Sequence, residues 1–435
     1  MKEKHFSFVL VSAFLFAVTL LAFVNFHNAN AQQQQRISFQ GKYGYQQPYK
    51  LVEESSIPEN IRKLNLSSRG LNQAGYIKVM VPYKIMPDAR AQDEGFSFFD
   101  ENRNVVYTKT FETTKIKPYE LTETIDYISN RVYNISKYGN YVLVGTIVKH
   151  VSPVEDGIDK FEIFDSQGEK KWEEEVTRFY DQFGPFFYLS DYDGKFVKII
   201  GTSIMFFDPQ GTMLKKVPIF TESGMELVSA SFSDNGEYFV LSVLEKVYYE
   251  DNPWFIMYTS QGEELWRFKG DGEYSILIDI SPDGSYVIAS TFSIENNRRS
   301  KHATYLIRID GTLVKKYDGI AASKIDFSPE SKHAVIIQGD KIHLIELESG
   351  DILLDYDYDF ISGDLLSEKN LVAMAKGSRL VVLHFDGTPV FLQNLKTMTT
   401  KDPYTWHGVE VRLSEDGEEI FILAEKQLFR FRLQK

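Results

Sequence analysis

Cysteine is absent from the 435 residues of this chain. Without a thiol the chain can form no disulfide, thiolate metal site, cysteine nucleophile or cysteine-linked lipid anchor. Basic residues are also in short supply, because 48 Lys and Arg stand against 61 Asp and Glu, which gives a formal net charge of −13. A protein that binds a nucleic-acid duplex needs a net basic surface, so we expect no nucleic-acid partner.

Signatures of catalysis and of metal binding are missing as well. The chain has no G-x-S-x-G nucleophile elbow and no G-x-x-x-x-G-K-[ST] phosphate loop, and its eight histidines form no H-E-x-x-H pattern. Asp355, Asp357 and Asp359 would share one face of a strand and could bind calcium there. Charges on an outermost strand also block sheet-to-sheet association, and this is the better interpretation. We therefore expect no metal and no cofactor.

The composition favours strands. Aromatic residues reach 14%, with 33 Phe, 25 Tyr and 4 Trp, and hydrophobic residues reach 43%. Flat rings pack well on a pleated surface, whereas almost no window of the sequence places apolar residues at helical spacing. These features predict an all-β protein.

Residues 1–31 have the pattern of an export segment. Lys2 and Lys4 precede an apolar stretch, Phe6–Phe26, and Ala29-Asn30-Ala31 matches a signal-peptidase site. The apolar stretch is long enough to cross a bilayer, so the segment is either a cleaved signal peptide or a retained membrane anchor. In both cases we expect the rest of the chain to be exported, to the periplasm or the extracellular space. Residues 32–75, polar and Gln-rich at their start, are predicted to form a linker.

From residue 76 the chain repeats two kinds of turn. The first follows the pattern Ser-x-Asp-Gly and leads into a strand, with successive copies 39 to 55 residues apart. In Ser281-Pro282-Asp283-Gly284 the serine caps the turn, the proline presets its own φ, and the glycine takes the last position of a type I turn. Its seven copies centre on Gly139, Gly194, Gly236, Gly284, Ser331, Asn370 and Gly417.

The second kind of turn falls between copies of the first. It joins two strands through a residue that tolerates positive φ, as in a β-hairpin. The copies centre on Gly168, Gly211, Gly262, Gly311, Gly350 and Gly387, and the hairpin Phe96–Phe111 begins the series.

Two hairpins per repeat make four antiparallel strands, which is the blade of a β-propeller. Residues 76–435 are thus predicted to form a propeller of seven four-stranded antiparallel blades, with eight as the alternative. We expect the ring to close with N- and C-terminal strands in one blade, where Leu428–Leu433 pairs with the hairpin Phe96–Phe111. In the alternative, Leu428–Leu433 and Tyr76–Lys84 together form a partial eighth blade.

These motifs resemble those of known propeller families. ISPDGSYVIAS and FSDNGEYFVLS are similar to the turns of WD-repeat-like and TolB-type propellers. YTSQGEELWRF and FDSQGEKKWEE resemble the tryptophan-docking repeat of quinoprotein propellers, with Trp172 and Trp266 at the docking position. The resemblance to quinoproteins implies a quinone cofactor, calcium and a vicinal cysteine pair, and this chain has no cysteine.

The long connections are predicted to gather at one end of the blades. We interpret Leu244–Pro253, Ser293–Ala303 and Thr397–Gly408 as long loops around the channel mouth, which would form a binding surface. Aromatic rings bury large areas at interfaces, and a basic island on an acidic protein can bind an acidic partner. The candidate residues on this surface are Tyr248, Tyr249, Trp254, Arg298, Arg299, Lys301, His302, Tyr404, Trp406 and His407.

The sequence favours a non-catalytic module of the cell envelope that binds or scaffolds another envelope protein. Fold alone does not assign a function, so other classes stay open. One is a receptor for carbohydrate or another small ligand. A second is an enzyme with its site at the channel mouth, and a third is a purely structural subunit.

Overall fold

The computed structural model divides the chain into two compact units, Met1–Gln46 and Gln47–Lys435. All residues that the structure describes belong to the second unit. They run from 49 to 434 with gaps at 57–60, 67–76, 86–90, 94, 100–103, 112–125, 137–138, 151–157, 178–185, 221–223, 248–249, 296–297, 340, 358–361, 377–378, 395–408, 415 and 425–426. The predicted export segment, residues 1–31, lies outside the described residues.

The described residues form strands β1–β33 and one 3-10 turn, η1 (Ser367–Lys369). The N-terminal strands are β1 (Tyr49–Ser56), β2 (Ile61–Leu66), β3 (Ile77–Ile85), β4 (Ala91–Asp93), β5 (Gly95–Phe99) and β6 (Val105–Thr110). Next come β7 (Asp126–Ile135), β8 (Tyr141–His150), β9 (Ile158–Asp165), β10 (Lys170–Thr177), β11 (Phe186–Leu189), β12 (Phe196–Ile200), β13 (Ser203–Phe207) and β14 (Met213–Pro218). They are followed by β15 (Gly224–Phe232), β16 (Tyr238–Val247), β17 (Glu250–Thr259), β18 (Glu264–Lys269), β19 (Tyr274–Ile280), β20 (Tyr286–Glu295), β21 (Arg298–Arg308) and β22 (Leu313–Asp318). The last are β23 (Lys324–Phe327), β24 (His333–Gln338), β25 (Lys341–Glu346), β26 (Ile352–Asp357), β27 (Ser362–Leu366), β28 (Leu371–Lys376), β29 (Arg379–His384), β30 (Pro389–Asn394), β31 (Val409–Leu413), β32 (Glu419–Ala424) and β33 (Gln427–Leu433).

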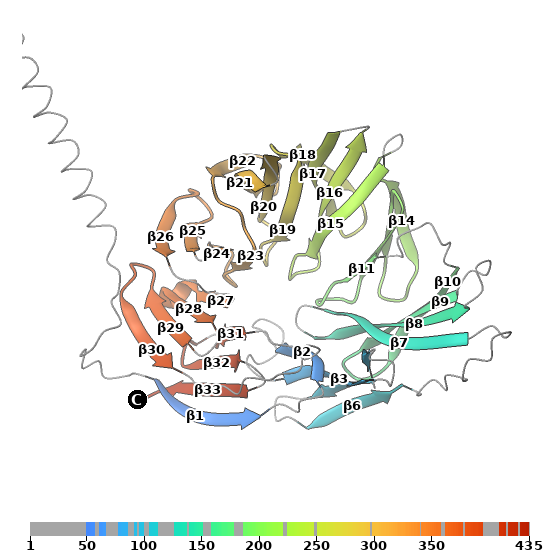
Figure 1. Cartoon of the computed structure of the whole chain (residues 1–435), viewed down its shortest axis with the longest axis horizontal. Coiled ribbons are helices and arrows are strands. Elements are labelled where there is room, and N and C mark those ends of the chain that lie inside the picture. Colours follow the sequence, from blue (N-terminus) through green and yellow to red (C-terminus); the bar gives the residue numbers. More distant parts are fainter. Residues whose placement is uncertain are drawn as a thin grey trace, which may run out of the picture. The chain divides into compact units, whose positions relative to one another are not determined.

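In the described part of the chain these strands form eight antiparallel sheets. Six sheets take four consecutive strands each, from β7–β10 to β27–β30. The first strands of successive sheets contact one another from β7 through β11, β15, β19, β23 and β27 to β31, so they form the inner edge. The sheets follow one another around a common centre (Figure 1). This is a β-propeller, as predicted, and its eight sheets match the alternative blade number.

Both kinds of predicted turn are present. At the β19–β20 turn the Gly284 amide donates to the Ser281 carbonyl at 2.9 Å, and the Ser281 hydroxyl bonds Asp283 Oδ1 at 2.9 Å. Gly284 has φ +81°, which costs glycine no steric strain. Ser331 and Asn370 hold the equivalent positions with φ of 54° and 53°, so the turn geometry survives where glycine is replaced.

The turns between third and fourth strands dock onto the preceding sheet. Trp172 on β10, four residues after the turn glycine Gly168, packs on Gly211 of the next sheet, and Trp266 on β18 packs in the same way on Gly311. The Trp266 indole also donates to the Ile309 carbonyl at 2.9 Å. The predicted docking position is therefore confirmed as a contact between neighbouring sheets.

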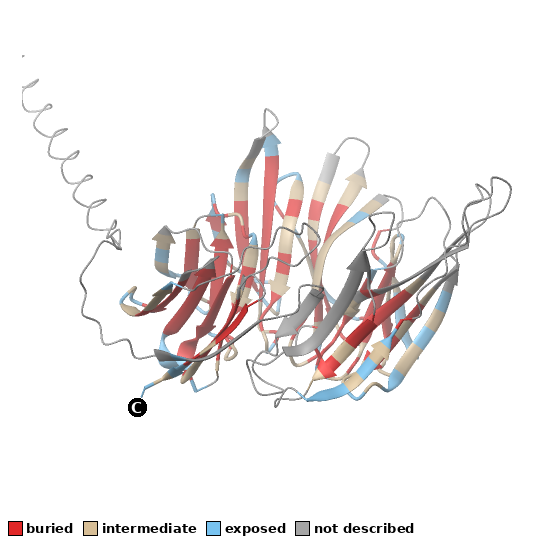
Figure 2. Ribbon diagram, turned by 60° about the horizontal axis from the view of Figure 1, so that its bottom comes forward, coloured by how far each residue is buried: buried red, intermediate tan, exposed pale blue. Residues whose placement is uncertain are grey.

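The apolar core lies between the sheets. Seven clusters of buried residues join each consecutive pair from the β2–β6 sheet to the β31–β33 sheet. At the last of these junctions the rings of Phe391 and Phe431 meet edge to face at 5.4 Å. Figure 2 shows buried residues concentrated in the middle strands, while outer strands such as β6 and β14 are largely exposed. The stability of the propeller therefore depends on contacts between sheets.

Ring closure differs from the prediction. Strand β33 pairs with β32 on one side and with β1, Tyr49–Ser56, on the other. The hairpin Phe96–Phe111, predicted to pair with it, contains β5 and β6 and belongs to a separate sheet with β2 and β3. That sheet also includes Ile77–Ile85, so the alternative that placed Tyr76–Lys84 in a partial blade with Leu428–Leu433 is wrong as well. The N- and C-terminal strands still share one sheet, as predicted.

The interval 32–75 is not a linker throughout. It contains β1 and β2, which pair with β33 and β3. Neither strand is preceded by one of the repeated turns, and β1 reads YKLVEESS, a polar strand. Its register comes from its partner strand, so its own pattern carried no signal of a strand.

The closing strand has the predicted two-sided character. Phe429 and Phe431 are each 2% exposed, while Arg430 and Arg432 face Glu419 of β32. Arg430 binds that carboxylate through both Nε and Nη2, at 3.1 and 2.7 Å. Burial opposes the charge on Glu419, but the hydrogen bonds from both arginines lower its pKa below the ordinary value. These ion pairs strengthen the β32–β33 pairing.

The stability of one junction between neighbouring sheets should depend on pH. The His333 ring lies 2.8 Å from Ser367 Oγ of the next sheet and edge-on against Phe385. Burial, the largest cause, lowers the pKa of His333; Glu346 and Glu330 raise it and Lys332 lowers it. The unfolded chain therefore binds a proton at His333 more tightly than the folded protein does. The contribution of His333 to the free energy of unfolding is complete above about pH 6.5, and it is lost as the pH falls through the lowered pKa.

We expect His333→Gln to reduce the fall in melting temperature between about pH 7 and pH 5. Thermal melts at several pH values measure this effect. The control is His384→Gln, since His384 is exposed on β29. Equal pH dependence in wild type and His333→Gln would contradict the assignment.

Candidate functional site

The two hairpins that carry most of the predicted site residues are longer than their neighbours. Strands β16 and β17 pair from Tyr238↔Thr259 to Val247↔Glu250, ten consecutive residue pairs. The equivalent strands β24 and β25 pair over six. Four further pairs extend a hairpin by about 13 Å. The predicted long loops Leu244–Pro253 and Ser293–Ala303 are therefore wrong as loops, because most of their residues continue the strands.

These hairpins define one end of the sheets, which we call the hairpin face: the ends of β16, β17, β20 and β21 around Val247, Glu250, Glu295 and Arg298. Within each sheet, the turns that join the first strand to the second and the third strand to the fourth lie at the opposite end. We call this end the turn face. The sheets β15–β18 and β19–β22 are adjacent, so their two hairpins are neighbours. Their extension is the feature that sets the hairpin face apart.

Trp254 lies on β17 at the base of the first hairpin and is partly buried. Its indole donates to Glu245 Oε2 at 2.9 Å, and the Lys269 ammonium lies 6.0 Å from the ring centroid. The ring also packs against the buried cluster of the β11–β18 sheets. Trp254 is thus held by both its polar and its apolar parts, and it offers a fixed aromatic edge with a cation beside it.

The second hairpin has an irregularity where the basic residues begin. Between Thr291↔Ala303 and Ser293↔Ser300 the β20–β21 register shifts, so Lys301 and His302 oppose Phe292 alone. Lys301 adopts φ 45° and is exposed, as a β-bulge allows. Arg298 and Arg299 lie on β21 beyond the bulge. The bulge therefore bends the hairpin just before the end that carries Arg298 and Arg299.

His302 lies in an aromatic layer beneath the bulge. Phe292 stacks on Tyr274 at 5.2 Å and contacts the His302 ring at 6.3 Å. His302 Nδ1 is buried without a hydrogen-bond partner among the described residues. His302 thus packs against Phe292 at the base of the hairpin, and its side chain is only partly accessible to solvent.

Five predicted site residues lie outside the described residues: Tyr248, Tyr249, Tyr404, Trp406 and His407. Trp254, Lys301 and His302 are brought to the hairpin face together with the strand positions of Arg298 and Arg299. These remain predictions as binding residues.

The inner strands carry a charge cluster on the C-terminal sheets. Arg412 Nη2 lies 2.5 Å from Glu410 Oε1, and Lys324 Nζ lies 3.0 Å from Asp326 Oδ2. Asp364 accepts the Leu413 amide at 2.7 Å. Burial works against the charge on Arg412, but Glu410, Asp364 and Asp326 raise its pKa. Because these carboxylates are paired, the cluster joins sheets rather than presenting a general acid or base.

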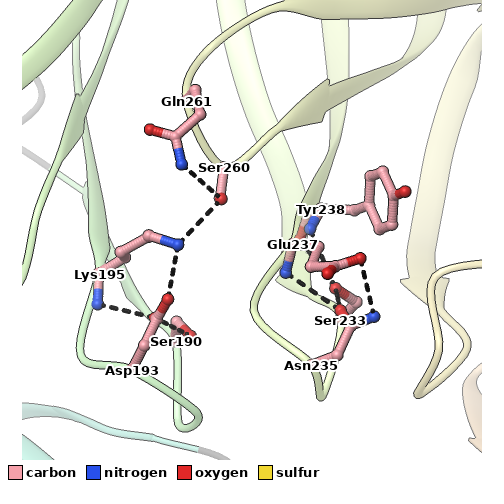
Figure 3. A network of polar contacts seen from close by, with 9 residues as sticks. All are labelled: Ser190, Asp193, Lys195, Ser233, Asn235, Glu237, Tyr238, Ser260 and Gln261. Atoms are coloured by element: carbon pink, nitrogen blue, oxygen red, sulfur yellow. Dashed lines mark hydrogen bonds and ion pairs between the residues drawn. The ribbon is translucent and has the colours of Figure 1, made fainter.

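The turn face is held by hydrogen bonds between neighbouring turns. The Lys195 ammonium pairs with Asp193 at 2.6 Å and donates to Ser260 of the next sheet at 3.2 Å (Figure 3). In the next turn the Ser233 hydroxyl donates to Asn235 Oδ1 at 2.6 Å (Figure 3). The first contact links successive sheets at this face, and the second fixes the shape of a single turn.

A cavity that sequence reasoning missed opens on the turn face. It has a volume of about 140 Å³ and lies between the ends of β7, β11 and β15. Its lining comprises Asn134, Ile135, Ser136, Tyr188, Leu189, Asp191, Ala230, Ser231, Phe232, Ser233 and Asp234. The available signal was the serine and aspartate of the repeated turn, which place polar groups at the end of each inner strand.

Within the described ranges no group of three or more His, Asp or Glu side chains could hold a metal ion. The same residues contain no helix long and apolar enough to span a bilayer.

Comparison with known proteins leaves the family open. No family model matches the chain, and no curated protein does. Among solved structures, the C-terminal WD40 domain of Sif2 is similar at 10% identity and TM-score 0.49, covering 90% of this chain and 100% of that one. The Dos1 propeller is similar at 12% identity and TM-score 0.47, covering 85% and 95%. The sheet topology of this chain itself defines it as a β-propeller repeat protein.

Proposed function

We propose that this chain is an exported, non-catalytic propeller that binds a partner protein of the cell envelope through its hairpin face. The observation that carries the proposal is the length of two neighbouring hairpins: β16–β17 pairs over ten residues and β20–β21 over nine, against six in β24–β25. None of the described residues past the sixth pair belongs to the buried clusters that join these sheets to their neighbours. These residues nevertheless continue the paired strands, with one bulge in β20–β21, which supports a role outside the fold.

The chemistry of the hairpins favours an acidic partner. The chain has a net charge of −13, yet the β21 end of the second hairpin carries Arg298, Arg299 and Lys301 within four residues. Such a basic island on an acidic protein favours approach by an acidic surface. The negative charge of the rest of the protein repels other copies of the chain. Trp254 adds a fixed ring on the neighbouring hairpin, a residue type that often dominates binding energy.

Export is supported by the sequence of residues 1–31, with its basic start, apolar stretch and Ala29-Asn30-Ala31. N-terminal sequencing of the native protein separates the two forms of the proposal. A start at Gln32 means a released protein, and an intact residue 1–31 segment means a tethered one.

Charge reversal on the hairpin face tests the binding proposal. We expect Arg298→Glu/Lys301→Glu to reduce recovery of the partner from solubilised envelopes of the source cells by about tenfold or more, because attraction is replaced by repulsion. The matched control is Lys332→Glu/Lys369→Glu, which reverses two exposed lysines on the turn face. Equal recovery with both variants, or no stoichiometric partner with wild type, would contradict the proposal.

A further inference from the structure

The cavity on the turn face has the size of a small ring. Its volume is about 140 Å³. A cavity of about 150 Å³ is large enough to bind benzene, so this one accommodates a ring of about six atoms. It is open to solvent on one side, which leaves room for substituents.

The lining mixes apolar and polar groups. Ile135, Leu189, Ala230 and Phe232 supply apolar surface, and the remaining residues supply hydroxyl, amide and carboxylate groups. Binding pockets for small organic ligands combine apolar walls with a few placed polar groups in this way. No lysine or arginine lines the cavity, and Asp191 and Asp234 do, so anions are disfavoured.

Most of the polar lining is fixed by the fold. Asp191 accepts from the Ser136 hydroxyl at 2.5 Å and from the Asn140 amide at 3.2 Å. Asn134 Nδ2 donates to the Phe187 carbonyl at 3.1 Å. These bonds hold the side chains in place before a ligand arrives, which lowers the entropy cost of binding.

Two hydroxyls are left for a ligand. The Tyr188 hydroxyl makes no hydrogen bond to the described residues, and its ring is held edge-on by Phe239 at 5.8 Å. Burial raises the pKa of Tyr188 to about 12, so the hydroxyl stays protonated and can donate. The Ser231 hydroxyl has only a long contact of 3.4 Å to the Phe232 carbonyl.

We infer that this cavity is a binding site for a neutral polyhydroxylated ring, a single pyranose unit of a carbohydrate. A pyranose has an apolar face for Phe232 and Tyr188 and a rim of hydroxyls that donate to carboxylates and accept from Tyr188 and Ser231. Carboxylates beside hydroxyl donors suit such a ring, whose hydroxyls both donate and accept. The site lies on the opposite end of the sheets from the hairpin face, so it is independent of the proposed protein partner.

Titration calorimetry of the full mature chain tests the site, with glucose, galactose, mannose and N-acetylglucosamine as probes. We expect at least one sugar to bind at millimolar concentration and Tyr188→Phe to weaken it by about fivefold to tenfold, through loss of one hydrogen bond. The control Tyr192→Phe removes a hydroxyl from a neighbouring tyrosine that is 59% exposed and does not line the cavity. It should bind like wild type.

Calcium chloride and putrescine form a second arm, because two carboxylates could instead attract a cation. Binding of either cation without any sugar would overturn the inference. The absence of sugar binding by wild type would do the same, as would unchanged sugar affinity in Tyr188→Phe. Since none of these titrations involves the hairpin face, their failure leaves the protein-binding proposal unaffected.

Discussion

Deleting residues 428–435 should abolish cooperative folding of the propeller near room temperature. The deletion removes Leu428, Phe429 and Phe431, which are each at most 2% exposed. At about 2–5 kcal/mol for each large buried side chain, their loss sums to roughly 6–15 kcal/mol. The entire stability of a typical domain lies in the same range.

The backbone adds to this loss. Strand β33 is internal, between β32 and β1. Its removal leaves β1 without a partner strand and β32 paired only with β31, and it opens the ring between the first and last parts of the chain. Exposed edges of this kind also promote association. We therefore expect the truncated protein to aggregate or to melt without a cooperative transition.

Thermal unfolding followed by circular dichroism, together with light scattering, measures this result. The matched control is deletion of residues 434–435, which lie past the end of β33 and should leave the midpoint unchanged. A chain lacking residues 428–435 that stays monomeric with an unaltered midpoint would show that β33 is dispensable for closure.

Gly211→Ala should destabilise the protein by about 2–5 kcal/mol. Gly211 has φ +80°, and a Cβ there would lie 2.0 Å from Cδ1 of Trp172 on the preceding sheet. A non-glycine residue in this region of φ costs about 1–2 kcal/mol, and forcing an extra methyl into a packed contact costs about 1–3 kcal/mol more. Trp172 itself is locked between Phe187 and Phe196 and has little freedom to move.

Gly201→Ala is the control for this prediction. Gly201 also has positive φ, +56°, but no atom lies within 4 Å of the added Cβ, so only the backbone cost applies. Denaturant unfolding of both variants, and of Gly211→Ala in a Trp172→Ala background, separates the two terms. In that background we expect Gly211→Ala to cost no more than Gly201→Ala does. Equal costs for the two single variants would refute the docking contact.

The sequence predicted what repeats and missed what occurs once. The Ser-x-Asp-Gly turns and the docking residues Trp172 and Trp266 recur with their own chemistry, so blades and contacts between sheets followed from them. Strand β1 has no such marker, because its hydrogen bonds come from β33, almost four hundred residues away. The repeat spacing could not tell a long loop from a long hairpin, since no glycine stands between Val247 and Glu250 to mark a turn.

The cavity was out of reach for a related reason. Its lining comes from three repeats, and residues such as Tyr188 and Ser231 are unremarkable within their own strands. They become neighbours only because β7, β11 and β15 converge at the inner edge. Polar groups at the end of each inner strand were visible in the sequence, whereas the space between them depends on how the sheets are packed.

Cross-linking of the native complex shows directly whether a partner protein binds to the hairpin face. Lysines report on both ends of the sheets: Lys246, Lys269 and Lys301 near the hairpin face, and Lys195, Lys332 and Lys369 on the turn face. Mass spectrometry of the cross-linked complex should find links to the partner from the first group and none from the second. Links confined to the turn-face lysines would show that the partner does not bind to the hairpin face.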